Sequence, residues 1–347
     1  MYGIIVWLSN GAEGPQTVVR RRADGLPSRL FARTYHTMRT IILGGTGFIG
    51  KALARLLSGQ GHEVVVPSRN PARVPAALGL GAPGARIIGV PFDGQTGAGW
   101  AEFITPDTAI VNLAGENIAD GRWTPDKKRR ILESRLDAGA AVMDALRQAG
   151  VLPAVLVQAS AVGYYGARGP EPVGEDAPPG ANFLAQVAGR WEASTLEAEA
   201  LGVRRIVVRT SMVLGRGGAL AKMLPPFKLG LGGPLGAGTQ MVPWIHLDDE
   251  VGAIAFLVAT PGLSGPFNLA APEAVDSRAF ARALGRALGR PAFLPAPGFA
   301  LKLLLGQMAE EVLLSGVRAE PTRLLAAGYR FRHPSLSGAL ANVLGRN

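Results

Sequence analysis

A glycine-rich loop near residue 45 constrains the fold of this chain more than any other sequence feature. Gly44-Gly45-Thr46-Gly47-Phe48-Ile49-Gly50 follows a short apolar run at residues 39–43 and precedes a helical pattern at residues 50–60. Glycines at this spacing let a strand turn directly into a helix and let the backbone approach a ligand closely. The helix then directs its N-terminal amides and dipole at an anion, typically a pyrophosphate.

A nucleoside triphosphate site is a second interpretation of the same loop. Gly45 to Lys51 also fits Gly-x-x-x-x-Gly-Lys, a pattern that cradles phosphates. That motif continues with Ser or Thr, which holds Mg²⁺, whereas this chain has Ala52. The dinucleotide interpretation is therefore preferred.

The end of the next predicted strand indicates which dinucleotide binds. About 20 residues after the glycines, an NAD site usually offers an Asp or Glu to the ribose hydroxyls. Here the strand ends Val66-Pro67-Ser68-Arg69, with no acidic residue. Arg69 can form a fork of hydrogen bonds with a 2′-phosphate and Ser68 can donate another, so we expect NADP. The alternative is that Arg69 is a solvated loop residue.

Apolar runs alternate with helical patterns along the chain, which predicts an α/β fold. Strands are predicted at residues 39–43, 64–66, 87–90, 109–113, 155–159 and 205–209. Helices are predicted at residues 50–60, 126–149, 183–200, 276–289 and 299–314. Such alternation is typical of a parallel sheet with helices on both faces. We expect a cofactor domain at 38–265, with some substrate-side elements from about 215, and a smaller C-terminal region at 266–347.

The composition excludes several kinds of site and partner. Cysteine is absent and there are four histidines, so we expect no disulfide and no metal site. The net charge of +10 suggests nucleic acid, an anionic membrane or a phosphorylated ligand. No nucleic-acid-binding motif is present, and no apolar run reaches the roughly 18 residues of a membrane span, since 299–314 carries three charges. We therefore expect neither nucleic acid nor membrane as a partner.

Residues 1–37 differ from the rest of the chain. They contain five arginines and two acidic residues, which is three of the ten net charges, and they show no sustained periodicity. A strand-like run begins directly after Met38. We interpret 1–37 as a disordered or non-native extension, with an Arg-rich transit peptide as the alternative.

Further motifs carry a family resemblance. They occur in this order: Val111-Asn-Leu-Ala-Gly-Glu-Asn117, Arg122-Trp-Thr124, Glu133-Ser-Arg135, Ser160-Ala-Val-Gly-Tyr-Tyr-Gly166, Trp191-Glu192, Arg209-Thr-Ser-Met-Val-Leu-Gly215, Leu229-Gly-Leu-Gly-Gly233, Pro243-Trp-Ile-His246, Leu313-Leu-Ser-Gly316 and Gly328-Tyr329. Together they resemble an atypical extended short-chain dehydrogenase/reductase of the NAD(P)-dependent epimerase/dehydratase superfamily. The set is most similar to epimerase family proteins of the 39U type, with a DUF1731-like C-terminal region, over about residues 38–345.

This resemblance implies a fold and a cofactor site. The fold is a Rossmann doubly wound parallel sheet with a smaller C-terminal α/β domain on the substrate side. The implied NADP contacts are Gly44, Thr46, Gly47, Phe48, Ile49, Gly50, Ser68, Arg69, Leu113, Ala114, Gly115, Arg135 and Val213. Leu113 to Gly115 would lie at the carboxyl end of a central strand, where ligands bind in open α/β sheets. From the sequence alone, a surface position on a helix is the preferred interpretation of Arg135.

The catalytic pair of this family is missing. Short-chain dehydrogenases use Tyr-x-x-x-Lys, in which the Tyr exchanges a proton and the Lys lowers its pKa. None of the five tyrosines here is followed by Lys at that spacing. Residues such as Leu184 and Ala188 stand at the usual positions before Trp191-Glu192, and neither transfers protons.

Three other residues are catalytic candidates. Ser160 ends a predicted strand where the family holds a carbonyl-polarising hydroxyl, and Tyr164 or the adjacent Tyr165 can supply a proton. His246, beside Asp248 and Asp249, has an intrinsic pKa near neutrality. The alternatives are a structural cap for His246 and aromatic packing for the tyrosines.

Two functions follow from these observations. The first is a cytoplasmic NADP-dependent oxidoreductase or epimerase acting on a small carbonyl compound or a nucleotide-sugar. The second is a catalytically degenerate NADP(H)-binding sensor or partner-binding protein. The sequence does not give the oligomeric state.

Overall fold

A computed structural model describes residues 37–79 and 86–345 of the chain. The predicted N-terminal extension, residues 1–37, lies outside the described residues except for Thr37. In the described part, no helix combines the length and the apolar character that crossing a membrane requires.

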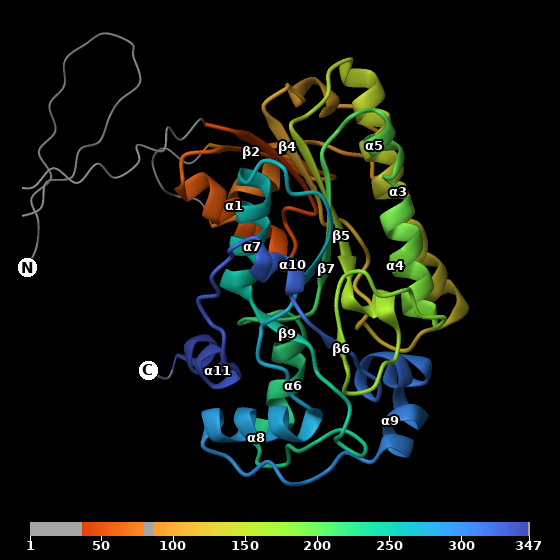
Figure 1. Cartoon of the computed structure of the whole chain (residues 1–347), viewed down its shortest axis with the longest axis vertical. Coiled ribbons are helices and arrows are strands. Elements are labelled where there is room, and N and C mark those ends of the chain that lie inside the picture. Colours follow the sequence, from red (N-terminus) through yellow and green to blue (C-terminus); the bar gives the residue numbers. More distant parts are fainter. Residues whose placement is uncertain (1–36, 80–85, 346–347) are drawn as a thin grey trace, which may run out of the picture. The chain divides into compact units, whose positions relative to one another are not determined.

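A seven-stranded sheet forms the centre of the fold (Figure 1). Its strand order is β10-β7-β5-β4-β1-β2-β3, and every pairing in it is parallel. The strands are β1 (Arg39–Leu43), β2 (Glu63–Ser68), β3 (Ile87–Pro91), β4 (Thr108–Asn112), β5 (Val155–Ala161), β7 (Arg205–Thr210) and β10 (Gly265–Leu269). This confirms the predicted doubly wound α/β fold.

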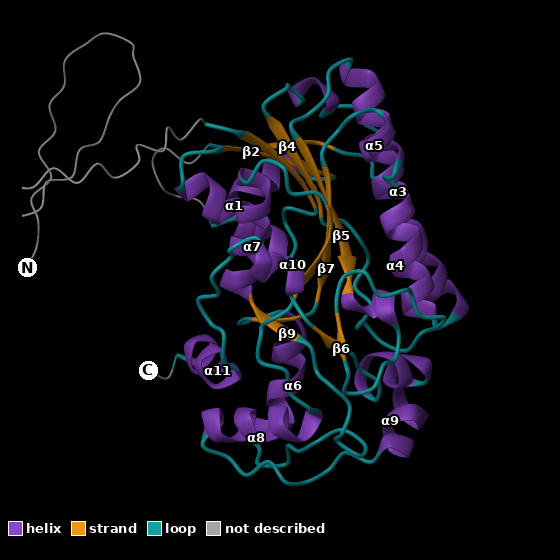
Figure 2. Ribbon diagram, in the orientation of Figure 1, coloured by secondary structure: helices purple, strands orange, loops and turns teal. Residues whose placement is uncertain are grey.

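Helices cover both faces of the sheet (Figure 2). One face packs against α1 (Phe48–Gly59) and α7 (Leu247–Ala259), and the other against α3 (Pro125–Ala149), α4 (Phe183–Ala193) and α5 (Glu197–Ala200). The buried strands alternate between two cores, because successive side chains of a strand point to opposite faces. On β1, Ile42 packs into the first core, while Ile41 and Leu43 pack into the second.

A second lobe lies beyond the carboxyl edge of the sheet. Its parallel pair is β8 (Met212–Leu214) with β9 (Trp244–His246), and a common core joins α6 (Gly218–Lys228), α8 (Ser277–Leu288) and α11 (Leu336–Leu344). The remaining elements are η1 (Pro71–Arg73), α2 (Val74–Ala77), η2 (Ala101–Phe103), η3 (Val162–Tyr165), β6 (Pro172–Val173), α9 (Gly298–Leu305), the π turn η4 (Ala309–Leu313), β11 (Arg318–Ala319) and α10 (Thr322–Ala326).

The structure differs from the predicted elements at three places. The helix predicted at 183–200 is divided into α4 and α5 around Ser194 and Thr195. The Ser194 hydroxyl donates to the carbonyl of Trp191, and the Thr195 hydroxyl donates to Oε1 of Gln158 on β5. The helix predicted at 299–314 stops at Gly306, whose φ is +62°. Strand β10 crosses the predicted boundary at residue 265, so the sheet takes its seventh strand from the expected C-terminal region.

Glu250 on α7 is a fully buried carboxyl group beside the end of β7. The Thr210 hydroxyl donates to Oε1 at 2.7 Å, while Oε2 has no hydrogen-bond partner among the described residues. Burial raises the pKa of Glu250 to about 8, so the group is neutral at pH 7.

We expect Glu250→Gln to stabilise the protein at alkaline pH. The folded-state pKa lies above the unfolded value of 4.5, so wild-type stability falls as the pH rises from about 4.5 to about 8. Gln has nearly the same shape and does not titrate. Urea unfolding should give similar stabilities at pH 5 and a gain of about 1 kcal/mol or more at pH 9. An equal loss at both pH values would contradict this assignment.

Candidate functional site

The glycine loop joins β1 to α1 through close backbone contacts. A Cβ on Gly50 would lie 2.3 Å from the carbonyl oxygen of Gly44, and one on Gly45 would lie 2.8 Å from the Val66 side chain. Gly44 itself has a φ of +79° and lies against the backbone of Leu113 and Ala114. Side chains at these positions would force β1, β2 and α1 apart, so the loop geometry requires glycine.

The N-terminus of α1 offers free amide groups to solvent. Gly47 is the N-cap, no side chain caps the helix, and its first turn contains no acidic residue. Thr46 and Gly47 are exposed. The first amides of a helix have no partner within it, so this end can bind an anionic group.

Phe48 connects the cofactor loop to the second lobe. Cβ atoms on Gly215, Gly217 and Gly218 would lie 2.7 to 3.1 Å from its ring. Val213, another predicted contact, is buried on β8 just before these glycines. Glycines thus let the 215–218 loop pack closely on the start of α1.

Arg69 follows the end of β2 and is exposed. It forms no hydrogen bond or ion pair with a described residue, whereas the Ser68 hydroxyl accepts the amide of Asn70 at 3.1 Å. An exposed guanidinium at this strand end can take a phosphate in a fork of hydrogen bonds.

Leu113 to Gly115 follow β4 and lie beside the glycine loop. The amide of Leu113 donates to the carbonyl of Leu43 at 3.0 Å. Arg135 packs against Gly115, donates to the carbonyls of Glu116 and Ile131, and lies 4.7 Å from the Trp191 ring. Burial lowers the pKa of Arg135 to about 10. These contacts make Arg135 a support of the 113–116 loop rather than the surface residue that its helix suggested.

Arg209 on β7 organises the end of β5. It is buried and binds both carboxylate oxygens of Glu192, at 2.8 and 3.0 Å. It also donates to the Tyr165 hydroxyl at 3.0 Å, and lies 3.6 Å from the centre of the Tyr164 ring. The pKa of Arg209 is raised by its bonds to Glu192 against the effect of burial, so its charge is retained.

Ser160 belongs to this ion pair. Its hydroxyl is buried and donates to Oε1 of Glu192 at 2.7 Å. The hydroxyl proton is therefore directed at a carboxylate in this structure. Ser160 lies at the predicted strand end, but it is coupled to a neighbour that the sequence did not indicate.

The two adjacent tyrosines have different surroundings. Tyr165 is fully buried and donates to Oδ1 of Asn268 at 2.7 Å, and burial raises its pKa. Tyr164 is only partly buried, and its hydroxyl bonds to no described residue. Of the two hydroxyls, only that of Tyr164 is free of a structural hydrogen bond within the described residues.

Leu184 and Ala188 lie one turn apart on α4. The Cδ1 of Leu184 lies 3.8 Å from the position of a Cβ on Gly163, in the turn that holds Tyr164. Ala188 is buried. Apolar side chains thus face η3 where the family's proton-transferring pair is expected.

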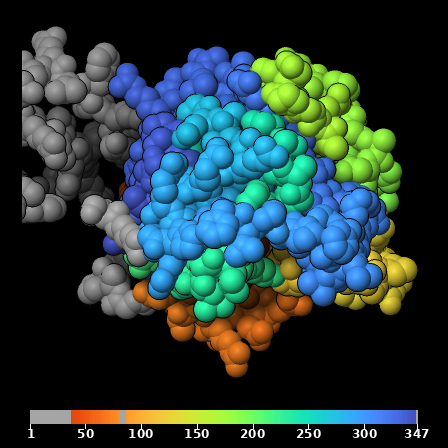
Figure 3. Space-filling model, turned by 90° about the horizontal axis from the view of Figure 1, so that it is seen from below, coloured from red at the N-terminus to blue at the C-terminus, as the bar shows by residue number. Residues whose placement is uncertain are grey.

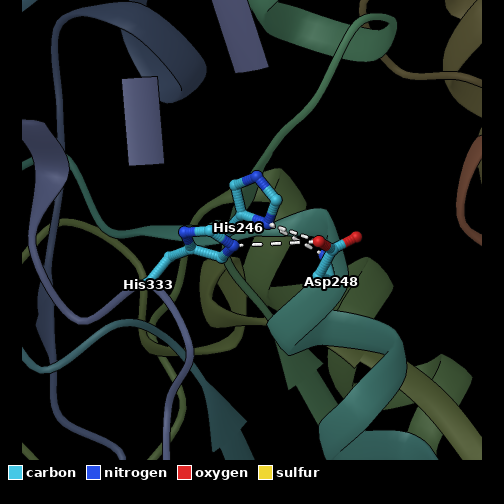
Figure 4. Close-up of side chains that lie close together, drawn as sticks. All are labelled: His246, Asp248 and His333. Carbon is cyan, nitrogen blue, oxygen red and sulfur yellow. Dashed lines mark hydrogen bonds and ion pairs between the residues drawn. The ribbon is translucent and has the colours of Figure 1, made fainter. Parts of the chain in front are cut away.

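His246 is the N-cap of α7. Its Nδ1 accepts the amide of Asp248 at 3.0 Å, and its ring stacks on His333 with ring centres 3.8 Å apart (Figure 4). The buried Asp249 holds His333 there by accepting its amide at 2.9 Å. None of these contacts reaches Ser160 or Tyr164, so the structure brings His246 together with a different group of residues.

His246, Asp248 and His333 place their ligand-type atoms within 4.8 Å of one another. The sequence predicts no metal site, and His333 is too far along the chain for spacing to suggest one. The lone pair of His246 Nδ1 already accepts the Asp248 amide, so a metal bound at that atom would break the cap. We assign His246 to helix capping.

Sequence reasoning missed the partners that hold the site together. In the sequence, Glu192, Arg209 and Glu116 stand out only as parts of motifs. In the structure, Glu116 also accepts a hydrogen bond from Lys127 Nζ at 2.7 Å. A charged residue directly after the apolar run Ile206–Val208 of β7 was the available signal for Arg209.

Known proteins share this fold and these motifs. A family model described as the NAD dependent epimerase/dehydratase family matches residues 40–270, more than half of the chain. The chain belongs to this family. A second model, a domain of unknown function called DUF1731, matches residues 296–343. The resemblance, including its DUF1731-like C-terminal region, is thereby confirmed.

Members of this family from distant organisms are similar to the chain over most of its length. Epimerase family protein SDR39U1 from Bos taurus is 39% identical, covering 88% of this chain and 100% of that protein. Epimerase family protein YfhF from Bacillus subtilis is 35% identical, covering 88% of this chain and 98% of that protein.

Solved structures of the family superpose on the chain. The crystal structure of human SDR39U1 with NADPH has a TM-score of 0.77 and 36% identity, covering 89% of this chain and 100% of that one. The UDP-glucose 4-epimerase of Thermus thermophilus with NAD, at 21% identity and a TM-score of 0.68, covers 89% of this chain and 98% of that one. At that identity the likeness shows the fold alone.

We expect the His246 cap to make the stability of this epimerase-family protein depend on pH. Burial and the neighbouring His333 lower the pKa of His246, so its contribution is complete above the ordinary value of 6.5 and declines as the pH falls below it. Asn also caps helices but does not titrate. Unfolding midpoints between pH 5 and 8 should fall less steeply on acidification for His246→Asn. Parallel curves for the two proteins would refute the prediction.

Proposed function

We propose that the chain is an NADP(H)-dependent oxidoreductase or epimerase. Its substrate would be a small carbonyl compound or a nucleotide-linked sugar. The observation that carries the cofactor choice is Arg69, an exposed guanidinium without a described partner at the end of β2. The NADPH in the human SDR39U1 crystal structure supports the same choice.

The residues present fit a dinucleotide phosphate. Glycine is required at 44, 45 and 50, and the uncapped, acid-free end of α1 can hold the pyrophosphate. Arg69 and Ser68 would hold the 2′-phosphate, and Leu113 to Gly115 would form the adjoining wall. When bound, NADP(H) supplies the hydride chemistry. The protein would provide orientation and a route for a proton.

Tyr164 is the proposed proton donor. Its hydroxyl has no described partner, and the stack on Arg209 fixes its ring beside the end of β5. Ser160 would bind the substrate oxygen after its hydroxyl turns away from Glu192. His246 has no place in this proposal, since its imidazole caps α7.

A cavity of about 540 Å³ opens between the loop after η3 and the second lobe. Gly236, Gln240, Met241 and Leu314 contribute to its wall, and Arg168 is its only charged lining residue within the described part of the chain. Neither Ser160 nor Tyr164 is among its lining residues, so it does not by itself locate the reacting part of the substrate.

Two observations favour a non-catalytic alternative. Leu184 and Ala188 replace the family's proton-transferring pair, and the Ser160 hydroxyl is bonded to Glu192. An NADP(H)-binding sensor or partner-binding protein needs neither group. Turnover decides between the two functions.

We expect Arg69→Ala to weaken NADPH binding by about 10- to 100-fold and leave NADH binding nearly unchanged. A hydrogen-bonded charged group contributes about 1.5–3 kcal/mol, and only NADPH carries the 2′-phosphate. Titration calorimetry with both cofactors measures this difference. Arg73→Ala, which removes another exposed arginine nearby, is the matched control. Equal losses for both cofactors would contradict the assignment.

We expect Tyr164→Phe to reduce turnover by about 100-fold or more while NADPH affinity is retained, since general acid catalysis contributes about 10²–10⁴-fold. NADPH consumption is followed against a panel of carbonyl compounds and UDP- and dTDP-sugars. Tight NADPH binding by the wild type without turnover on any of them would favour the sensor function. Turnover that is unchanged in Tyr164→Phe would exclude Tyr164 as the donor.

A further inference from the structure

Six large apolar side chains are exposed at the end of the second lobe. We call Leu229, Leu231, Phe293, Phe299, Leu303 and Leu304 the apolar surface; each exposes between 61% and 77% of its area. Helix α9 contributes three of them and has no buried residue. Single exposed apolar residues are ordinary, but a group of this size marks an interaction site.

The segments that carry these residues lie side by side. The amide of Leu294 donates to the carbonyl of Gly232, and the amide of Ala296 donates to that of Pro234. Gly236 and Gly298 approach each other at the start of α9. Figure 3 looks at this end of the molecule, where blue segments around residues 290–305 lie beside the teal segment before residue 240.

The same part of the chain is rich in basic residues. Residues 216–247 and 277–309 contain eight Lys and Arg residues and no Asp or Glu, and two of the eight, Lys222 and Lys302, are paired with Asp120 and Glu310 outside these ranges. Arg282 and Arg286 lie one turn apart on α8 and, with Lys228 and Arg290, are exposed. None of these four forms an ion pair or side-chain hydrogen bond with a described residue. Their charge is therefore available to an anionic partner.

We propose that the apolar surface and these cations bind the surface of a membrane that contains anionic lipids. Helices that lie in a membrane interface combine Phe and Leu side chains, which enter the acyl boundary, with Lys and Arg, which contact the headgroups. The phosphates of the lipid headgroups supply the negative charge that the two basic segments lack. Binding of this kind is peripheral and needs no membrane-spanning helix.

A second copy of the chain is a less favourable occupant. A two-fold contact through the apolar surface would bring the same patch of both copies together. Lys228 and Arg290 would then face like charges, and neither basic segment provides a carboxylate to compensate. Opposite charge thus favours the lipid surface over self-association.

This inference revises the expectation of no membrane partner. That expectation rested on the absence of a long apolar run, which excludes only a spanning helix. The sequence at 299–314 fits a helix packed on a core equally well, so only the tertiary structure shows that α9 is exposed.

The test is binding of the full chain to vesicles of phosphatidylcholine with and without phosphatidylglycerol, measured by co-sedimentation. We expect binding only with phosphatidylglycerol, and weakening at high salt. A variant with Phe299→Ser, Leu303→Ser and Leu304→Ser should bind at least about tenfold more weakly. A variant with Lys228→Glu and Arg290→Glu should bind these vesicles at least about fivefold more weakly for each substituted residue.

Matched controls distinguish the surface from general effects. Leu196→Ser with Leu201→Ser removes exposed leucines elsewhere, and Arg129→Glu with Arg147→Glu makes the same charge change outside the surface. Both controls should bind like the wild type, and NADPH binding reports correct folding of every variant. Binding that survives the α9 substitutions would overturn the proposal. The proposal would also be overturned if light scattering showed a dimer that the same α9 substitutions convert to monomers, while the chain bound no vesicles.

Discussion

The buried ion pair between Arg209 and Glu192 holds together the end of β5 and the elements around it. It joins β7 to α4, and through the hydroxyls of Ser160 and Tyr165 it reaches the end of β5 and the turn η3. Removing a single partner from such a pair leaves an uncompensated buried charge, which destabilises a protein by about 3–5 kcal/mol. The arrangement therefore persists only with all of its members, and it fixes where Tyr164 lies.

The same network attaches α10 and the segment after β6 to the sheet. Asn268 on β10 accepts the Tyr165 hydroxyl, and the buried Glu175 accepts the amides of Asn268 and Arg323. The start of α10 is thus attached to the carboxyl edge of the sheet by groups that also contact Arg209. Phe48 packs under the glycines of the 215–218 loop and so links the start of α1 to the second lobe.

The sequence predicted the elements of the sheet and the glycine loop because these depend on local signals. Apolar runs and glycine spacing report burial and backbone freedom at each position. The pairing of Arg209 with Glu192, 17 residues earlier, does not appear in any local pattern. His246 was ambiguous for the same reason, since its stack on His333 depends on how the C-terminal segment returns to α7. Strand β10 was missed because the short run of Gly265–Leu269 contains Gly, Pro and Asn, which are depleted in strands.

The positive charge of the chain also has a different explanation once the structure is known. The sequence alone suggested that part of the net charge of +10 serves a phosphorylated dinucleotide. In the proposed cofactor site, backbone amides and glycines would hold the pyrophosphate, and Arg69 would be the side-chain cation that binds the 2′-phosphate. Most of the uncompensated charge lies instead in two segments of the second lobe that contain no carboxylate. A cofactor site needs few cations because a helix N-terminus already binds anions. The excess charge therefore belongs to a surface distinct from the cofactor loop.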